Sequence, residues 1–254
     1  MAGLHPKNAG KSTLSVIVIT YNEEENILAC LESVGWADEL VVVDGGSRDK
    51  TVELASQFGA NVLHKNFVGY GSQKQFALEN STGDWVLSLD ADEQVTPELR
   101  DEISTILFRQ KVAKGYEIPF KNIFFGKWLK HAGLYPDYHL RLFRRASGAF
   151  TPSTIHEGIE LEPPFGRCRN PILHFSYPTV ADYITKMNRY TKLLADNRKP
   201  FRLGHMVFSP VSKFFRLYIA RRGFRDGLTG LVYCLLASFY NFVKDAKQWE
   251  KVSS

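Results

Sequence analysis

The sequence is poor in cysteine and has no apolar leader, and each lack excludes a class of protein. The cysteines among its 254 residues are Cys30, Cys168 and Cys234, far apart and none in a C-x-x-C pair. This pattern predicts neither a disulfide framework nor a cysteine zinc site, and it favours a reducing compartment. The first residues, MAGLHPKNAGKST, are polar and lack the features of a signal segment.

The chain also lacks a phosphate-binding P-loop, internal repeats and low-complexity segments. NAGKST matches the end of G-x-x-x-x-G-K-[ST], but that motif needs a glycine where His5 stands. The segment also precedes the first predicted strand, whereas a P-loop follows one. With 44% apolar and 23% charged residues, the composition predicts one large domain, or a domain with an appendage, and excludes a disordered chain.

Positive charge is concentrated toward the C-terminus. The net charge is +5, yet residues 186–225 contain eleven lysines or arginines and one acid, Asp196, which gives a local charge of +10. The remaining residues therefore carry −5, the difference between these two values. A basic section joined to an acidic body indicates an anionic partner for that section, and nucleic acid and an anionic membrane both qualify.

The first hundred residues alternate between strand-like and helix-like segments. Apolar, β-branched runs at 14–20, 39–44, 61–66 and 85–93 are each followed by a helical pattern, at 22–34, 49–59, 71–83 and 96–110. Asn22 is expected to cap the first helix, with acids in its first turn. Short loops between alternating strands and helices predict an α/β fold with a doubly wound, mostly parallel sheet.

The pattern changes in the second half of the chain. Segments 114–129, 138–145, 147–161 and 171–178 are predicted strands of a smaller mixed or antiparallel section, and 179–199, 209–224 and 226–249 are predicted helices. The expected organisation is a flexible N-terminus at 1–13, a first half at 14–110, a second half at 111–177 and a basic, amphipathic helical tail at 178–254.

Polar side chains follow three of the predicted strands. Those side chains are Thr20, Tyr21, Asn22 and Glu23 after the first strand, Asp44 after the second, and Asp90, Asp92 and Glu93 after the fourth. In doubly wound sheets, ligands bind beyond the carboxyl ends of the strands. Two carboxylates about 4 Å apart repel by roughly 1 kcal/mol in water and by about 4 kcal/mol near a protein surface. A divalent cation beside Asp90 and Asp92 would offset that repulsion.

With these residues in place, the chain resembles the inverting family 2 glycosyltransferases of GT-A fold. The segments SVIVITYNEEENI, VVVDGGSRDKT and LSLDADE carry the resemblance over about the first hundred residues, in the family's order and spacing. The later segments GKWLKHAGLYPDYHLRLFRR, TIHEGIEL and LHFSYP are similar to a narrower branch, the bacterial lipopolysaccharide-core β-1,4-glucosyltransferases. The resemblance implies a nucleotide-sugar-binding half at 14–110 and an acceptor-binding, catalytic half at 111–177.

The resemblance also implies a metal and a donor site. Asp92 would bind Mg²⁺ or Mn²⁺ together with the diphosphate of a nucleotide sugar, and Asp90 would hold the ribose or share the metal. Such a cation stabilises the charge on a departing diphosphate as a Lewis acid. His156 or His174 could complete the metal shell or contact the diphosphate. An ordinary hydrogen-bonded histidine is the alternative for each.

Further donor contacts follow from the same resemblance. Asp44 matches the family's base-binding aspartate and favours a uridine diphosphate sugar, and a turn-forming residue is the alternative interpretation. Thr20, Tyr21 and Glu23 would lie beside the same nucleotide. Lys74 stands where the family often carries an arginine that faces the nucleotide, and an exposed helix lysine is its alternative.

Inversion at the anomeric carbon requires one general base on the acceptor hydroxyl and no covalent intermediate. The family usually offers an acidic pair followed by leucine and arginine. Here PDYHLRLFRR supplies Asp137 ahead of Arg141, and Pro136 replaces the first acid. We expect Asp137 to be the base, with Glu157 of IHEG as the alternative, and Arg141 to contact the donor phosphates or the acceptor. A structural role is open for either acid.

The helical tail contains a run of 17 uncharged residues, 227–243. As a helix this run is about 26 Å long, shorter than the roughly 30 Å core of a bilayer. We expect a helix packed on the domain or lying at a membrane surface, beside the aromatic and basic segment SKFFRLYIARRGF. Residues 186–243 would then contact an anionic membrane peripherally, at the inner, cytoplasmic face. A helical pair with a solvated basic face is the alternative.

These expectations converge on a metal-dependent hexosyltransferase. It would move a hexose, glucose by resemblance, from a nucleotide diphosphate sugar to a sugar of a membrane-anchored glycolipid such as the lipopolysaccharide inner core. The alternatives are a protein or polyprenyl phosphate acceptor, or a nucleotide-sugar-binding protein without catalysis. Nucleic acid is not expected as a partner, because the chain has no recognisable module for it and the acidic strand ends would have no role.

Overall fold

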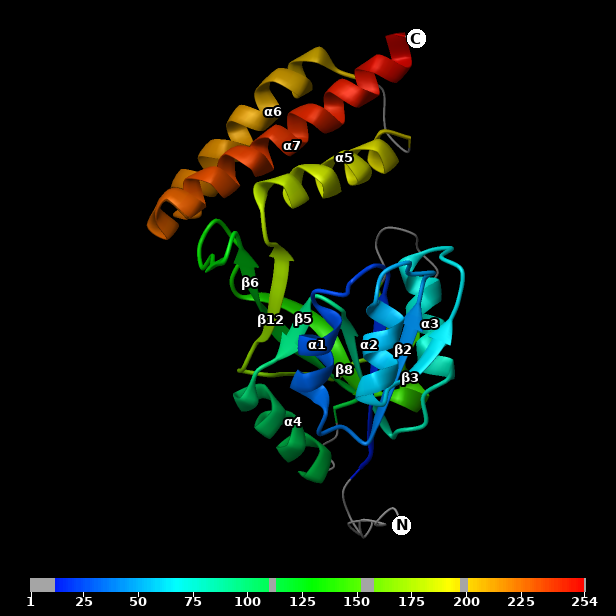
Figure 1. The fold of residues 1–254 in the computed structure, drawn as a ribbon. Coiled ribbons are helices and arrows are strands. Elements are labelled where there is room, and N and C mark those ends of the chain that lie inside the picture. Colours follow the sequence, from blue (N-terminus) through cyan, green and yellow to red (C-terminus); the bar gives the residue numbers. More distant parts are fainter. Residues whose placement is uncertain (1–11, 110–112, 152–157, 197–200, 254) are drawn as a thin grey trace, which may run out of the picture. The chain divides into compact units, whose positions relative to one another are not determined.

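The computed structural model describes residues 12–109, 113–151, 158–196 and 201–253. The chain divides into two compact units (Figure 1). Unit 1 comprises Met1–Phe120 and Tyr138–Leu173, and unit 2 comprises Lys121–Asp137 and His174–Ser254. Neither unit is one continuous segment, because the chain passes between them more than once. The organisation into 14–110, 111–177 and 178–254 stays a prediction.

A parallel sheet forms the first half of unit 1. Its strands are β1 (Leu14–Thr20), β2 (Glu39–Asp44), β3 (Asn61–His64) and β4 (Trp85–Asp90), in the order β3-β2-β1-β4. All three neighbouring pairs are parallel. Strands β1, β2 and β4 are almost wholly buried because both faces of the sheet are covered, as their continuous apolar runs indicated. The doubly wound arrangement predicted from the sequence is confirmed.

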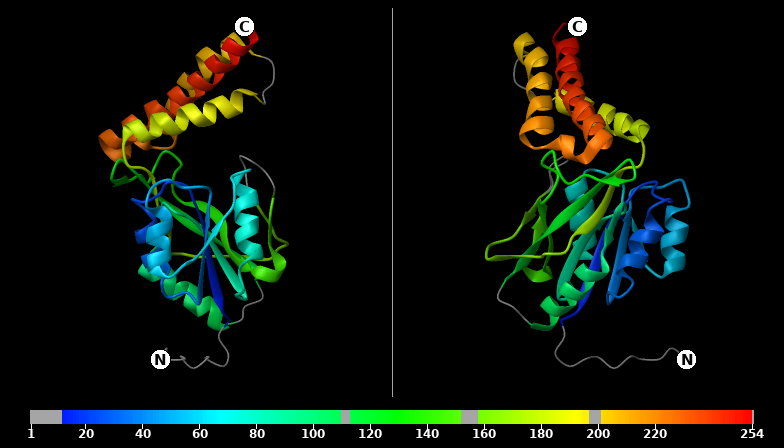
Figure 2. Two further views of the ribbon diagram at one scale, coloured as in Figure 1. Left: turned by 45° about the vertical axis from the view of Figure 1, so that its right-hand side comes forward. Right: turned by 90° about the vertical axis from the view of Figure 1, so that its left-hand side faces the viewer.

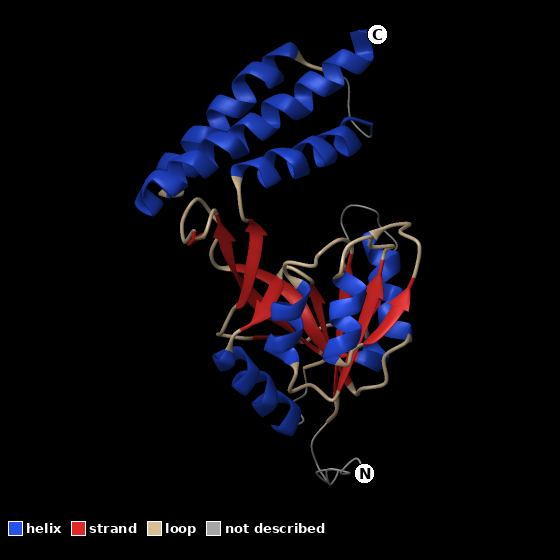
Figure 3. Cartoon of the chain, viewed as in Figure 1, coloured by secondary structure: helices blue, strands red, loops and turns tan. Residues whose placement is uncertain are grey.

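The sheet continues beyond β4 with mixed pairing. The remaining elements of this section are β5 (Glu93–Val95), β6 (Gly115–Phe124), β7 (Lys127–Trp128), β8 (Asp137–Arg144), β11 (Phe165–Arg167) and β12 (Ile172–Tyr177). The strand β8 runs antiparallel to β4, and β7 antiparallel to β6, whereas β11 is parallel to β6. The predicted mixed section therefore extends the same sheet. Figure 3 shows these strands in red.

Helices cover both faces of the unit 1 sheet. They are α1 (Ile27–Val34), α2 (Thr51–Phe58), α3 (Tyr70–Glu79) and α4 (Pro97–Arg109). Side chains of α1, α2 and α4 join one core cluster, and α3 packs on the opposite face with β9 (Ala149–Phe150) and β10 (Ile159–Glu160). The helix α4 starts where the sequence predicts, because Pro97 suits the first helical position and Thr96 Oγ1 accepts the Leu99 N–H at 3.2 Å.

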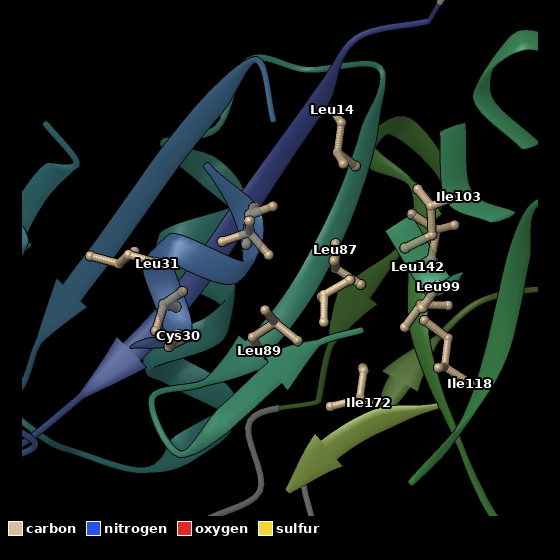
Figure 4. Packing of buried hydrophobic residues seen from close by; sticks show 14 of the residues in the cluster. Leu14, Cys30, Leu31, Leu87, Leu89, Leu99, Ile103, Ile118, Leu142 and Ile172 are labelled. Carbon is tan, nitrogen blue, oxygen red and sulfur yellow. The ribbon is translucent and has the colours of Figure 1, made fainter. Parts of the chain in front are cut away.

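The larger core cluster lies under α1 and α4 (Figure 4). Leu87 and Leu89 point from β4 into it, between Leu31 of α1 and Leu99 of α4, and all four are fully buried. Burial of each such side chain stabilises the fold by about 1.5–3 kcal/mol. This packing fixes β4, and with it the acidic segment that follows.

One local prediction, the helix cap, is wrong. Asn22 does not cap α1, which begins at Ile27 after Asn26 and has no acid in its first turn. Instead Asn22 has a φ of +54°, and its Oδ1 accepts the Arg48 N–H at 2.8 Å. It therefore joins the loops that follow β1 and β2, a contact that helix capping rules do not anticipate. Segment 147–161 contains, in its described part, the two short strands β9 and β10, which pair antiparallel with each other as a separate sheet.

Unit 2 contains the helical tail. Its elements are α5 (Val180–Asp196), α6 (Leu203–Phe215), the π-helical turn Arg216–Ala220, the 3₁₀ turn Gly223–Asp226 and α7 (Gly227–Ser253). The helices α6 and α7 lie side by side in all views (Figure 2). The helix α6 begins six residues earlier than the predicted segment 209–224. Among the helices that the structure describes, Gly223–Val252 is long and apolar enough to cross a membrane, judged by length and composition alone. Of its most apolar stretch of 18 residues, 22% is buried within the protein.

Candidate active site

Three neighbouring strands bring the predicted donor residues to one edge of the sheet. Thr20 at the end of β1 pairs with Asp44 at the end of β2, and Ile19 pairs with Asp90 at the end of β4. Adjacent strands are about 4.8 Å apart. The carboxyl ends of β2, β1 and β4 therefore present Asp44, Thr20 and Asp90 side by side, although these residues are far apart in the sequence.

The Asp44 carboxylate organises the turn after β2. Its Oδ2 accepts the N–H groups of Gly46 at 2.8 Å and Ser47 at 3.0 Å, and its Oδ1 accepts the Ser47 hydroxyl at 2.5 Å. Gly46 has a φ of +102°, which favours glycine. Asp44 is thus a turn-forming residue, as the alternative interpretation held. The Ser47 N–H also lies 3.2 Å from Oδ1, and His64 Nδ1 lies 3.6 Å from Oδ2. A carboxylate has about four lone-pair positions, so a ligand N–H at Asp44 would share its oxygens with these groups.

Thr20, Tyr21 and Glu23 occupy the loop after β1 in different ways. Thr20 Oγ1 is buried and has no hydrogen-bond partner within the described residues. The Tyr21 side chain is exposed and its ring lies against Gly45. Glu23 Oε2 instead accepts a hydrogen bond from Asn26 Nδ2 at 2.7 Å, which supports the start of α1.

Asp90 belongs to a charge cluster with Glu93, Lys74 and Arg141. Lys74 Nζ lies 2.9 Å from Asp90 Oδ1, and Arg141 Nη2 lies 3.3 Å from Asp90 Oδ2 and 2.7 Å from Glu93 Oε1. Glu93 is fully buried, and its Oε2 accepts the Asp90 N–H at 3.0 Å. The charges of the two acids and the two bases balance. Lys74 and Arg141 therefore already offset part of the repulsion among the carboxylates that follow β4.

The cluster also defines Lys74 and Arg141 more closely than the sequence did. Lys74 is 1% exposed, which excludes the alternative of an exposed helix lysine. The Arg141 guanidinium lies 4.9 Å from the centre of the Phe120 ring, a cation–π contact that fixes its plane. Sequence reasoning missed Glu93 as the buried partner of Arg141. In the sequence, the only indication of this role was the position of Glu93 directly after D-A-D.

Asp92 is half-buried and follows Asp90 by two residues. Negative charge at this strand end also acts on the thiol of Cys30. Burial raises the pKa of this thiol well above its ordinary value, and the charges of Glu93, Asp92, Asp90 and Glu23 raise it further. Within the described residues no three His, Cys, Asp or Glu side chains form a metal-binding group. A cation held by one or two carboxylates and completed by substrate phosphates needs no such group, so Asp92 fits this kind of site.

The predicted catalytic residues of the second half are only partly described. Glu157 and His156 lie outside the described residues. Asp137 is the first residue of β8 and half-buried, and its charge is among the causes, after burial, that raise the pKa of Tyr233 in the same unit. His174 Nδ1 lies 2.9 Å from Asn122 Oδ1 and 3.1 Å from Ser176 Oγ, so His174 has ordinary hydrogen-bonding partners.

The sequence is similar to known glycosyltransferases, over part of the chain in some cases and over nearly all of it in others. Residues 15–150 match the sequence profile of Glycosyl transferase family 2. The lipopolysaccharide core biosynthesis glycosyltransferase LpsC of Rhizobium meliloti is 31% identical over 252 residues, which cover 95% of this chain and 93% of LpsC. An undecaprenyl-phosphate 4-deoxy-4-formamido-L-arabinose transferase of Pseudomonas aeruginosa is 36% identical over 121 residues, 41% of this chain and 34% of that protein.

Among solved structures, the crystal structure of S. aureus TarS 1–349 is similar at a TM-score of 0.46. It is 15% identical, and the match covers 95% of this chain and 91% of that chain. At this score the similarity has no bearing on the chemistry of the site. The profile match spans more than half of the chain, and the match to LpsC spans nearly all of it. This chain therefore belongs to glycosyltransferase family 2, and its α/β fold is the GT-A fold that the sequence predicted.

Proposed function

We propose that the chain transfers a hexose, glucose, from a uridine diphosphate sugar to a sugar of a membrane-anchored glycolipid such as the lipopolysaccharide inner core. The observation that carries the proposal is the common sheet edge of β2, β1 and β4, where Asp44, Thr20 and Asp90 are neighbours. That edge is where doubly wound sheets bind nucleotides. A uracil N–H can donate to Asp44, and the ring of exposed Tyr21 offers a face for stacking.

The divalent cation of this reaction would be held by Asp92. Asp90 is ion-paired with Lys74 and Arg141, and these cations compete with a metal for its oxygens, so Asp90 is better suited to holding the ribose. A bound Mg²⁺ or Mn²⁺ supplies Lewis acidity toward the diphosphate. Lys74 and Arg141 set the orientation of the Asp90 carboxylate at the strand end. Arg141 also pairs with Glu93, whose Oε2 accepts the Asp90 N–H, so Arg141 supports the backbone just before Asp92.

Asp137 is the proposed general base. A carboxylate can take the proton of an acceptor hydroxyl as that oxygen attacks the anomeric carbon, and one such base is sufficient for inversion. Asp137 is half-buried at the start of β8. Limited solvation weakens the competition of water for its oxygens. Glu157 remains the second candidate for this role.

The similarity to LpsC supports a glycolipid acceptor, because it extends over the second half and the tail as well as the donor half. The match to the undecaprenyl-phosphate transferase covers 41% of the chain, and gives correspondingly less support to a polyprenyl phosphate acceptor. A glycolipid acceptor implies a location at the cytoplasmic face of the membrane. Peripheral contact through 186–243 suits the basic charge of that section.

A donor screen tests the proposal. The melting temperature of the full chain is measured with uridine, guanosine and thymidine diphosphate sugars, each with Mn²⁺ or with a chelator. We expect stabilisation by UDP-glucose that disappears on chelation and in Asp92→Asn, but persists in the control Asp101→Asn, an exposed carboxylate on α4. Transfer to a purified inner-core glycolipid is then measured. Equal shifts with every nucleotide, or a shift without metal, would contradict the donor site described above.

A further inference from the structure

An open hollow lies along α6, beside Asn241 of α7, apart from the residues assigned above to the donor and the base. Its volume is about 360 Å³, and its lining residues are His205, Phe208, Ser209, Ser212, Lys213, Arg216 and Asn241. All of them belong to unit 2. The volume is at the lower end of the range of small-ligand sites, and the lining combines two cations with hydroxyl and amide groups.

A hydrogen-bonded chain fixes the Lys213 ammonium at this hollow. Lys213 Nζ donates to Asn241 Oδ1 at 3.1 Å, and Asn241 Nδ2 donates to Ser209 Oγ at 3.0 Å, which links α6 to α7. The ammonium also lies 5.7 Å from the centre of the Tyr240 ring. A lysine restrained in this way loses less side-chain entropy when it binds a ligand than a freely moving one.

Positive charge accumulates around Lys213. Its pKa is lowered by burial first, and then by the neighbouring charges of Lys244 and Arg216. The carboxylate of Asp245 is buried and lies 2.8 Å from Nδ1 of His205, which lines the hollow. A negatively charged ligand would relieve the repulsion between Lys213 and Arg216 and gain hydrogen bonds from both.

The backbone at the end of α6 and the exposed apolar side chains of that helix are also unusual. Arg216 begins a π-helical turn, Arg216–Ala220, directly after α6, and such turns occur frequently at functional sites. Phe208, one of the lining residues, is 73% exposed, and Val211 and Phe215 on the same helix are also exposed. A cationic hollow inside an exposed aromatic and aliphatic surface matches a lipid, whose headgroup is anionic and whose neighbouring region is apolar.

We propose that this hollow binds the phosphomonoester headgroup of a membrane lipid, with Lys213 and Arg216 contacting the phosphate and Phe208 entering the interface beside it. Hydroxyl groups of Ser209 and Ser212 supply further hydrogen-bonding positions. A phosphomonoester fits better than a diester because it presents three terminal oxygens to these donors. This inference rests on the membrane contact of the proposed function, and it adds a specific headgroup to a general electrostatic attraction.

Flotation of the full chain on vesicles tests the inference. Phosphatidylcholine vesicles contain either phosphatidic acid, a monoester, or phosphatidylglycerol, a diester, adjusted to equal surface potential. We expect about tenfold tighter binding to the monoester, the effect of one charge-assisted hydrogen bond. Lys213→Met/Arg216→Gln should remove this preference. The matched control Arg189→Gln/Arg225→Gln, which removes two exposed cations outside the hollow, should weaken binding to both vesicles equally.

Two further measurements complete the test. Ser212→Glu places a carboxylate at an exposed helix position in the hollow, and should abolish the preference even if the double variant folds poorly. Equal binding of the wild-type chain to both vesicles would overturn the headgroup site, as would binding of inorganic phosphate without any preference between the vesicles. The UDP-glucose melting shift should be unchanged in all these variants. Its absence from the wild-type chain would refute the proposed function instead and leave the headgroup result standing.

Discussion

Replacing Arg141 by glutamine should destabilise unit 1 strongly, because it leaves a buried acid without its cation. Glu93 is fully buried, and Arg141 Nη2 lies 2.7 Å from its Oε1. Removal of one partner from a buried ion pair costs about 3–5 kcal/mol. The loss extends to Asp90, whose Oδ2 lies 3.3 Å from the same guanidinium nitrogen. We therefore expect Arg141→Gln to lower the free energy of unfolding by about 3–5 kcal/mol.

Urea unfolding followed by tryptophan fluorescence measures this effect, since Trp85 is buried in the unit 1 core. The control is Arg100→Gln, which breaks an exposed pair with Asp101 on α4 and should cost about 0–1 kcal/mol. Glu93→Gln should partly rescue Arg141→Gln, because the uncompensated charge is then absent. If Arg141→Gln and Arg100→Gln unfold at the same urea concentration, or the double variant shows simple additivity, the cluster does not act as a coupled buried network.

Three other perturbations have defined outcomes. Asp44→Asn should cost about 1–3 kcal/mol of stability, since the amide group opposes the N–H donors of Gly46 and Ser47; urea midpoints measure it, and an unchanged midpoint would contradict the turn role. Asp137→Asn should reduce kcat by about 10²–10⁴-fold with the KM for the sugar nucleotide unchanged, and an unaltered kcat would transfer the base role to Glu157. Burial raises the pKa of the Cys168 thiol from 9.0 to about 12, so the stability that this protonated thiol contributes is present below pH 9 and is lost as pH rises from 9 to 12. Cys168→Ala should flatten that decline in the urea midpoint, and an identical decline would show that other groups cause it.

Much of the fold was predictable because local pattern and topology agree. Continuous β-branched runs at Leu14–Thr20, Glu39–Asp44 and Trp85–Asp90 predict strands covered on both faces, and these three strands are nearly fully buried. Their alternation with helices leaves few topologies, which is why the common edge for Asp44, Asp90 and Thr20 followed from the sequence. Errors arose where a side chain bonds across loops, as Asn22 does with Arg48.

The sequence by itself determined the order of strands and helices, the family, and the presence of acids at the strand ends. Only the tertiary structure decided what those acids contact: Lys74 and Arg141 come from segments on either side of β4, and they neutralise Asp90 and Glu93 while Asp92 stays half-buried beside them. The physical reason is that periodicity reports which face of an element is buried. Charge pairing depends on which distant segments meet at short range, and no local pattern encodes that.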